Sequence, residues 1–250
     1  MGELFGFDSA IRTSWSLQRR TERPGHYREE GWGVALFEGP AAGVFRQPRG
    51  VPDEFMAGVL ASRRLQGEGG LAYIRRWTNS PGLANCHPFT REMGGREWAF
   101  AHNGRLEGIR EVSKLHPTTY QPIGSTDSEY AFCAMLSVMS GRRGDPPASH
   151  RETVHQVSTE MARHGALNYV LLTERCLYAF TSGEYGLHLW ERRAAEGPVT
   201  LRDEDWEMHL ESPEPADLVV VATNRMAKEP GWRALRPGEL VLAVNGRVVE

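Results

Sequence analysis

The sequence has little cysteine and no paired metal-binding spacing. Its 250 residues include three cysteines, Cys86, Cys133 and Cys176, and no CxxC pair. An odd number of widely spaced cysteines argues against a disulfide framework and against a cysteine-rich zinc site. We therefore expect buried thiols, no metal site and a cytoplasmic location.

Long apolar runs and strongly basic runs are also missing. No apolar segment approaches the roughly 20 residues that span a bilayer, and the N-terminus lacks the basic and apolar regions of a signal peptide. The formal net charge of -3 at pH 7 gives no general attraction to a polyanion. The protein is therefore expected to be neither secreted nor membrane-spanning, and not to bind nucleic acid.

The chain does contain enough apolar side chain for one sizeable core. Hydrophobic residues make up 40% of the sequence, and no convincing interdomain linker interrupts them, so we expect one domain over residues 1–250. Strand-like segments recur along the whole length, at residues 33–37, 71–74, 98–101, 169–172, 177–180, 218–221 and 240–243. Several are nearly continuous apolar runs, which predicts sheets covered by helices or by another sheet.

Helical patterns lie between these segments. Residues 128–139 place apolar side chains at helical spacing, and Asp127 stands where an N-cap is expected. Two further helices are predicted over residues 154–164 and, after Pro52, over residues 53–65. Asn245 and Gly246 separate two strand-like runs, which predicts a hairpin and therefore antiparallel pairing.

Five short motifs follow one another in the first half of the chain. They are GELFG at residues 2–6, EGWGVA at 30–35, AYIR at 72–75 continued by HPFTRE at 87–92, WAFAHNG at 98–104 and GSTDSE at 124–129. Together they resemble the small free-standing bacterial members of the class II glutamine amidotransferase family. The resemblance implies an α+β fold of the N-terminal nucleophile hydrolase type, a four-layer αββα sandwich of two antiparallel sheets, and no cofactor.

The resemblance also implies roles for individual residues. Arg75 would hold the α-carboxylate of the ligand with its fork-shaped guanidinium, and Asp127 would hold the ammonium group. The Asn103 side-chain amide and the Gly104 N–H would form an oxyanion hole. Residue chemistry alone leaves simpler interpretations open, in which Asp127 only caps a helix and Asn103 with Gly104 only forms a turn.

Five further residues near these motifs are considered as candidates for the site. By the same resemblance, Thr78 and Asn79 stand at the spacing where the family lines its glutamine pocket. His87 and His102 do not make a tetrahedral metal site without a second pair of ligands. Cys86 could serve as a nucleophile only if the fold brought it to His102.

The nucleophile of the family is missing. In the family Met1 is removed, and a cysteine at position 2 supplies both the thiolate and the α-amine that acts as its base. Gly2 keeps an amine with a pKa of about 7.7 to 8.0 but has no thiol for it to activate. Three explanations are open: an engineered substitution in an active enzyme, a natural loss of catalysis, or slower hydrolysis by another residue or a water molecule.

These features lead to a functional expectation. The resemblance implies that the protein binds glutamine or a γ-glutamyl amide for hydrolysis to glutamate and ammonia, with a separate enzyme as the possible ammonia acceptor. With Gly2 in place, the chain is expected to be inactive or severely impaired. The competing interpretation is a noncatalytic sensor or scaffold that binds a γ-glutamyl ligand.

Overall fold

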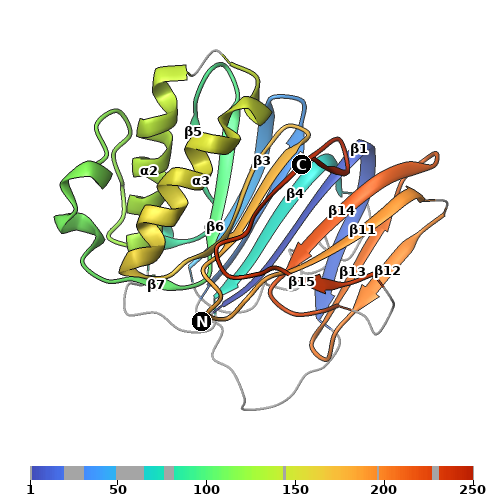
Figure 1. The fold of residues 1–250 in the computed structure, drawn as a ribbon. Helices are drawn as coiled ribbons and strands as arrows, with labels where there is room; N and C mark the ends of the chain where they lie inside the picture. The colour runs from blue at the N-terminus through green and yellow to red at the C-terminus, as the bar shows by residue number, and fades with distance from the viewer. Residues whose placement is uncertain are drawn as a thin grey trace.

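The fold consists of two antiparallel β-sheets packed face to face, with two helices on the outer side of one of them (Figure 1). The computed structural model describes residues 2–19, 31–48, 65–75, 82–142, 145–195, 197–226 and 231–249. All seven strand-like segments of the sequence lie within strands of these sheets.

The first sheet is built around the long N-terminal strand. Its described strands run in the order β15-β11-β14-β1-β4-β2-β3, and a β12–β13 hairpin joins β1. Their bounds are β1 (Gly2–Arg19), β2 (Gly31–Glu38), β3 (Ala41–Gln47), β4 (Leu65–Arg75), β11 (His188–Ala195), β12 (Val199–Arg202), β13 (Trp206–Glu211), β14 (Ala216–Ala222) and β15 (Arg233–Ala234). The first half of β1 pairs with β14 and the second half with β13. On its other side β1 pairs with β4, and the register of that pairing shifts between Asp8 and Thr13.

The second sheet runs in the order β17-β16-β10-β9-β6-β5. Its strands are β5 (Phe89–Glu92), β6 (Glu97–His102), β9 (Asn168–Thr173), β10 (Cys176–Thr181), β16 (Leu240–Val244) and β17 (Arg247–Val249), and a separate ladder joins β7 (Arg105–Leu106) to β8 (Gly165–Ala166). Asn245 and Gly246 link β16 to β17 with φ angles of 51° and 73°. Left-handed backbone at both positions is what a type I′ hairpin requires, so the predicted hairpin is confirmed.

The helices cover the second sheet. The helices of the described residues are α2 (Asp127–Met139) and α3 (Arg151–Met161). Short 3₁₀ turns lie at η1 (Leu83–Asn85), η2 (Ile109–Glu111), η3 (Ser113–Leu115), η4 (Ser140–Arg142), η5 (Pro147–His150) and η6 (Ala162–His164). The helix expected over residues 154–164 therefore begins three residues earlier and ends in η6. The helix expected over residues 53–65 falls almost wholly outside the described residues. No helix of the described part has the length and apolar content that a membrane crossing needs.

The start of α2 corrects one expectation. The N-cap is Thr126, whose hydroxyl accepts a hydrogen bond from the Glu129 N–H at 3.1 Å. Asp127 is the first helical residue, and its carboxylate reaches the Leu106 N–H instead. Threonine and aspartate are both good N-caps, so the sequence alone did not decide which of two neighbours would take the position.

Alternation along β1 separates two apolar layers. Leu4 belongs to the buried cluster between the sheets, together with Val170 and Leu177 of the second sheet. Phe5 and Phe7 belong to a second cluster on the other face of the first sheet, where the Phe5 ring lies 6.1 Å from the Trp206 ring. This period of two is typical of a strand buried on both faces. The α+β sandwich of two antiparallel sheets that was expected is thus confirmed.

Candidate functional site

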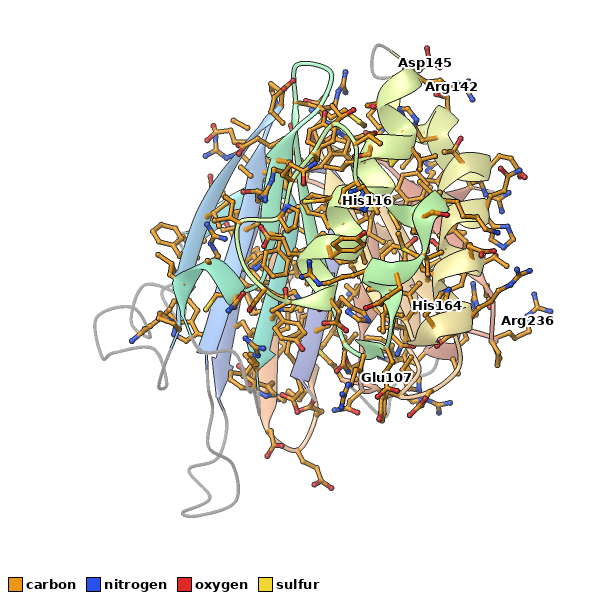
Figure 2. The ribbon with its side chains drawn as sticks, turned by 90° about the vertical axis from the view of Figure 1, so that its left-hand side faces the viewer. Glu107, His116, Arg142, Asp145, His164 and Arg236 are labelled. Atoms are coloured by element: carbon orange, nitrogen blue, oxygen red, sulfur yellow. The ribbon has the colours of Figure 1, made fainter. Side chains whose placement is uncertain are left out.

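The residues of interest gather at one end of the sandwich. Gly2 begins β1, Arg75 ends β4, Asn103 follows β6 and Asp127 begins α2. Figure 1 shows the N-terminus at the same end as β7, and Figure 2 shows Glu107, just after β7, at the opposite end from Arg142 and Asp145. Segments that are far apart in sequence therefore meet where β1 starts.

A direct hydrogen bond joins the first and the fourth of the five sequence motifs. The Gly2 nitrogen donates to the Asn103 side-chain oxygen Oδ1 at 3.0 Å. The Asn103 backbone is fixed on both sides by Asn168, which accepts from the Asn103 N–H at 2.8 Å and donates its side-chain amide to the Asn103 carbonyl at 2.9 Å. Asn103 is only 2% exposed, so its amide group is held in one orientation with its oxygen toward Gly2.

Gly104 lies where the chain passes too close to a neighbour for any side chain. A Cβ atom at this position would lie 2.0 Å from the Ala166 carbonyl oxygen. Asn103 and Gly104 do not form a hairpin, because β6 pairs with β5 and β9, whereas β7 pairs with β8. The turn interpretation of these two residues is therefore wrong, and the Gly104 N–H donates to no backbone carbonyl of the described residues.

Asp127 connects the start of α2 to β7. Its half-buried carboxylate accepts hydrogen bonds from the Leu106 N–H at 2.7 Å and from the Ser128 N–H at 2.9 Å, and it has a longer contact with the Ser128 hydroxyl at 3.4 Å. An ionised carboxylate offers about four acceptor sites, so these contacts still leave acceptor capacity for a ligand. Asp127 is thus both a structural tie and a candidate anion for an ammonium group.

Arg75 is tied to the loop that precedes α2. It pairs with Gly2 where β4 lies beside β1, and its Nη1 donates to the Asn85 carbonyl at 2.9 Å. The Asn85 side-chain oxygen in turn accepts from the Ser125 N–H at 2.8 Å. This chain of contacts places the guanidinium on the same side of the sandwich as the segment that carries Asp127.

Tyr73 lies in β4, two residues before Arg75 and on the same face of the strand. Burial raises the pKa of its phenol, the charge of Arg75 lowers that pKa, and the charge of Asp127 raises it. Both charges therefore act on one hydroxyl. The sequence pattern predicts Tyr73 only as part of a strand.

Two buried histidines near these residues, His87 and His102, are neutral. The His102 Nε2 atom faces the Ala166 carbonyl at 3.1 Å, so it carries the proton, and Nδ1 accepts from the Ser128 hydroxyl at 2.9 Å. Burial lowers the pKa of His102 and holds the pKa of His87 well below its ordinary value. Both ring nitrogens of His102 are engaged, so neither can act as a base for Cys86.

Cys86 is a poor replacement nucleophile. Its thiol donates to the Gly82 carbonyl at 3.4 Å, it is 3% exposed, and burial raises its pKa. A nucleophilic cysteine needs the opposite shift. Within the described residues no group of three or more histidine, cysteine, aspartate or glutamate side chains could hold a metal ion. Thr78 and Asn79 lie outside the described residues, and their assignment to the pocket stays a prediction.

Comparison with known proteins agrees with this geometry. The sequence profile of the class-II glutamine amidotransferases matches residues 1–250. YafJ of Escherichia coli, whose name assigns it to the glutamine amidotransferases, is 32% identical over 259 residues that cover 100% of both chains. A Haemophilus influenzae protein with the same assignment is 30% identical and covers 88% of this chain and 75% of its own length.

Solved structures show the same fold. A predicted glutamine amidotransferase from Pseudomonas aeruginosa superposes with a TM-score of 0.82 at 28% identity, over 99% of both chains. Glutamine phosphoribosylpyrophosphate amidotransferase of Bacillus subtilis matches with a TM-score of 0.62 at 16% identity, over 99% of this chain and 48% of its own, which shows the fold alone. The chain therefore belongs to the class-II glutamine amidotransferases.

Proposed function

We propose that this protein binds glutamine or a γ-glutamyl amide at the end of the sandwich where β1 begins, and that it does not hydrolyse the amide at an enzymatic rate. Arg75 holds the α-carboxylate and Asp127 holds the α-ammonium. Asn103 and Gly104 face the side-chain carbonyl. The observation that carries this proposal is the hydrogen bond between the Gly2 nitrogen and Asn103, made where Gly2 also pairs with Arg75.

The charge arrangement suits an amino acid ligand. A free amino acid presents a carboxylate and an ammonium group on adjacent atoms, and each is best matched by an opposite charge in a partly desolvated site. Arg75 at the end of β4 and Asp127 at the start of α2 supply one charge of each sign at the same end of the sandwich. The two ends of one zwitterion require this pair of charges.

The absence of a nucleophile sets the limit on catalysis. The family reaction forms a γ-glutamyl thioester, and Gly2 has no atom that can form this bond. Its nitrogen still donates a hydrogen bond to Asn103. The α-amine that acts as the base in the family would therefore have no thiol to activate. Cys86 does not compensate, because it is buried with a raised pKa.

The proposed function also suggests where the protein acts and with what kind of partner. The three cysteines are free and buried, which fits the reducing cytoplasm. A bound γ-glutamyl ligand with no turnover suits a sensor or scaffold that reports the ligand to another protein. A relative with an intact nucleophile would release ammonia for a separate accepting enzyme.

Calorimetric titration with glutamine tests the proposal. The unaltered chain should bind, and Arg75→Ala should weaken binding by about tenfold to a hundredfold, since it removes a hydrogen bond to a charged group. The matched control is Arg105→Ala, which removes a side chain that is 79% exposed and pairs with Glu107. Equal affinities for the three proteins, or no binding by the unaltered chain, would contradict the proposal.

A glutaminase assay separates a ligand-binding protein from a disabled enzyme. The unaltered chain and Gly2→Cys are compared for ammonia release from glutamine. Release by Gly2→Cys alone would identify an enzyme that lacks only its nucleophile. Binding without release in both forms would favour the noncatalytic interpretation.

A further inference from the structure

The space beside Gly2 is filled by the phenol of Tyr73. A Cβ atom added at Gly2 would lie 2.3 Å from the Tyr73 hydroxyl oxygen and 2.4 Å from Cζ. It would also lie 2.8 Å from the Ile74 carbonyl oxygen. All three distances are shorter than carbon approaches such atoms in proteins, so a side chain at residue 2 and the phenol cannot occupy this place together.

The phenol is held in position from several sides. Tyr73 is 6% exposed, and its backbone pairs with Leu4 on one side and Gly33 on the other. Its ring lies 4.3 Å from the His87 ring, which lies 4.5 Å from the Phe89 ring. Moving the phenol away from Gly2 would open this stack and leave a cavity.

The segment that carries His87 is packed closely against β2 and cannot easily move away from Tyr73. A Cβ atom at Gly33 would lie 2.1 Å from the His87 carbonyl oxygen, so β2 passes directly against this segment. Neither ring nitrogen of His87 has a hydrogen-bond partner in the part of the chain that the structure describes. The ring therefore serves as a packing surface that supports the phenol.

The hydroxyl of Tyr73 is available as a donor. None of the described residues forms a hydrogen bond with it, and the influences on its pKa are burial and the charges of Arg75 and Asp127. The ordinary pKa of a phenol is about 10, and burial raises the pKa of Tyr73 further, so the hydroxyl is protonated at neutral pH. In the proposed binding mode the side chain of the ligand ends next to this hydroxyl.

We propose that Tyr73 takes the place of the missing nucleophile, filling the volume that a side chain at residue 2 would need and donating a hydrogen bond to the side-chain end of the bound ligand. Gly2 and Tyr73 are thus a matched pair, and Gly2 is a feature of a remodelled site rather than an isolated lesion. The donor role rests on the proposed function, whereas the packing role does not. A consequence is that Gly2→Cys alone restores no glutaminase activity.

A double-mutant cycle on thermal stability tests the packing. Gly2→Ala should lower the melting temperature by about 3 to 10 °C, the range expected for overpacking in a chain of this size. In a Tyr73→Leu background, which removes the phenol and keeps an apolar side chain, the same substitution should have little effect. The control is Gly141→Ala, because a Cβ atom there meets nothing within 4 Å.

The packing role is overturned if Gly2→Ala lowers the melting temperature equally in both backgrounds, or no more than Gly141→Ala does. If Tyr73→Leu does not fold, Tyr73→Met serves as the background, since a flexible apolar side chain can withdraw from residue 2. The cycle needs no ligand, so its result stands whether or not glutamine is the right probe.

Binding of glutamine by Tyr73→Phe tests the donor role. The ring and its packing remain, so the melting temperature should stay unchanged, while the dissociation constant should rise about threefold to tenfold through loss of one neutral hydrogen bond. Unchanged affinity would overturn the donor role. If the unaltered chain does not bind glutamine at all, the proposed function and the donor role both fail, and the stability cycle still decides the packing role.

Discussion

Replacing Asp127 by asparagine separates the structural role of this carboxylate from its proposed role in ligand binding. The carboxylate accepts hydrogen bonds from the N–H groups of Leu106 and Ser128. An asparagine has one side-chain oxygen and keeps at most one of these bonds, which costs about 0.5 to 1.5 kcal/mol. Loss of the negative charge at the start of α2 costs about 0.3 to 1 kcal/mol more.

The stability loss is therefore about 1 to 2.5 kcal/mol, or a drop of about 2 to 10 °C in melting temperature. The loss in affinity should be larger. Removing a carboxylate that binds an ammonium group costs about 1.5 to 3 kcal/mol, which weakens glutamine binding by about tenfold to 150-fold. Thermal denaturation and calorimetric titration of Asp127→Asn measure the two effects on the same protein.

Thr126→Ala is the matched control. It removes the N-cap bond to the Glu129 N–H and should cost about 1 kcal/mol in the same helix. Thr126 has no role in the proposed pocket. The affinity of the Thr126→Ala variant for glutamine should therefore stay within about a factor of two of the affinity of the unaltered chain, a difference of about 0.4 kcal/mol. If both variants weaken glutamine binding equally, Asp127 acts only by supporting the helix, and its proposed role in binding the ammonium group is wrong.

Three further changes test the structure around the site. Gly104→Ala should destabilise the fold by about 1 to 3 kcal/mol in urea titration, because its Cβ would meet the Ala166 carbonyl at 2.0 Å; an unchanged midpoint would contradict the close approach. Asp8, whose pKa burial raises from 3.8 to about 7, ionises in the unfolded chain before the folded one, so stability should fall as pH rises from about 4 to 7; Asp8→Asn should abolish that decline, and a parallel pH profile would refute the assignment. Arg91→Ala removes the partner of Glu129, which is 2% exposed, and should cost about 3 to 5 kcal/mol at pH 7 by thermal denaturation.

Much of the fold was predictable because its apolar pattern is strong. Every strand-like segment became a strand, since runs such as residues 169–172 and 218–221 are buried along their whole length. Residue order alone did not show that β1 divides between two partners. That division, and the register shift of β1 against β4 between Asp8 and Thr13, appear only in the pairing of the strands.

The site was partly predictable for a different reason. Arg75, Asn103 and Asp127 stand in motifs, and the structure brings them to one end of the sandwich. The contact of Tyr73 with Gly2 could not be read from the sequence, because it depends on the register that pairs Gly2 with Arg75 in the neighbouring strand. Side-chain reach across strands is a tertiary property, and a one-dimensional pattern gives only the face on which a residue lies.

The start of α2 shows the limit of local rules. Thr126 and Asp127 are adjacent residues with similar capping ability, and the nearby Leu106 N–H engages the aspartate. A local pattern located the helix to within one residue, and a contact distant in sequence decided its first residue.

The proposed function requires that the chain holds an intact amino acid ligand at the end of the sandwich where β1 begins. A crystal structure of the unaltered protein with glutamine is the sharpest test. We expect uncleaved glutamine with its carboxylate on Arg75, its ammonium on Asp127 and its side-chain end between Asn103 and Tyr73. Glutamine bound elsewhere, an empty site at saturating glutamine, or a covalent adduct on Cys86 would contradict it.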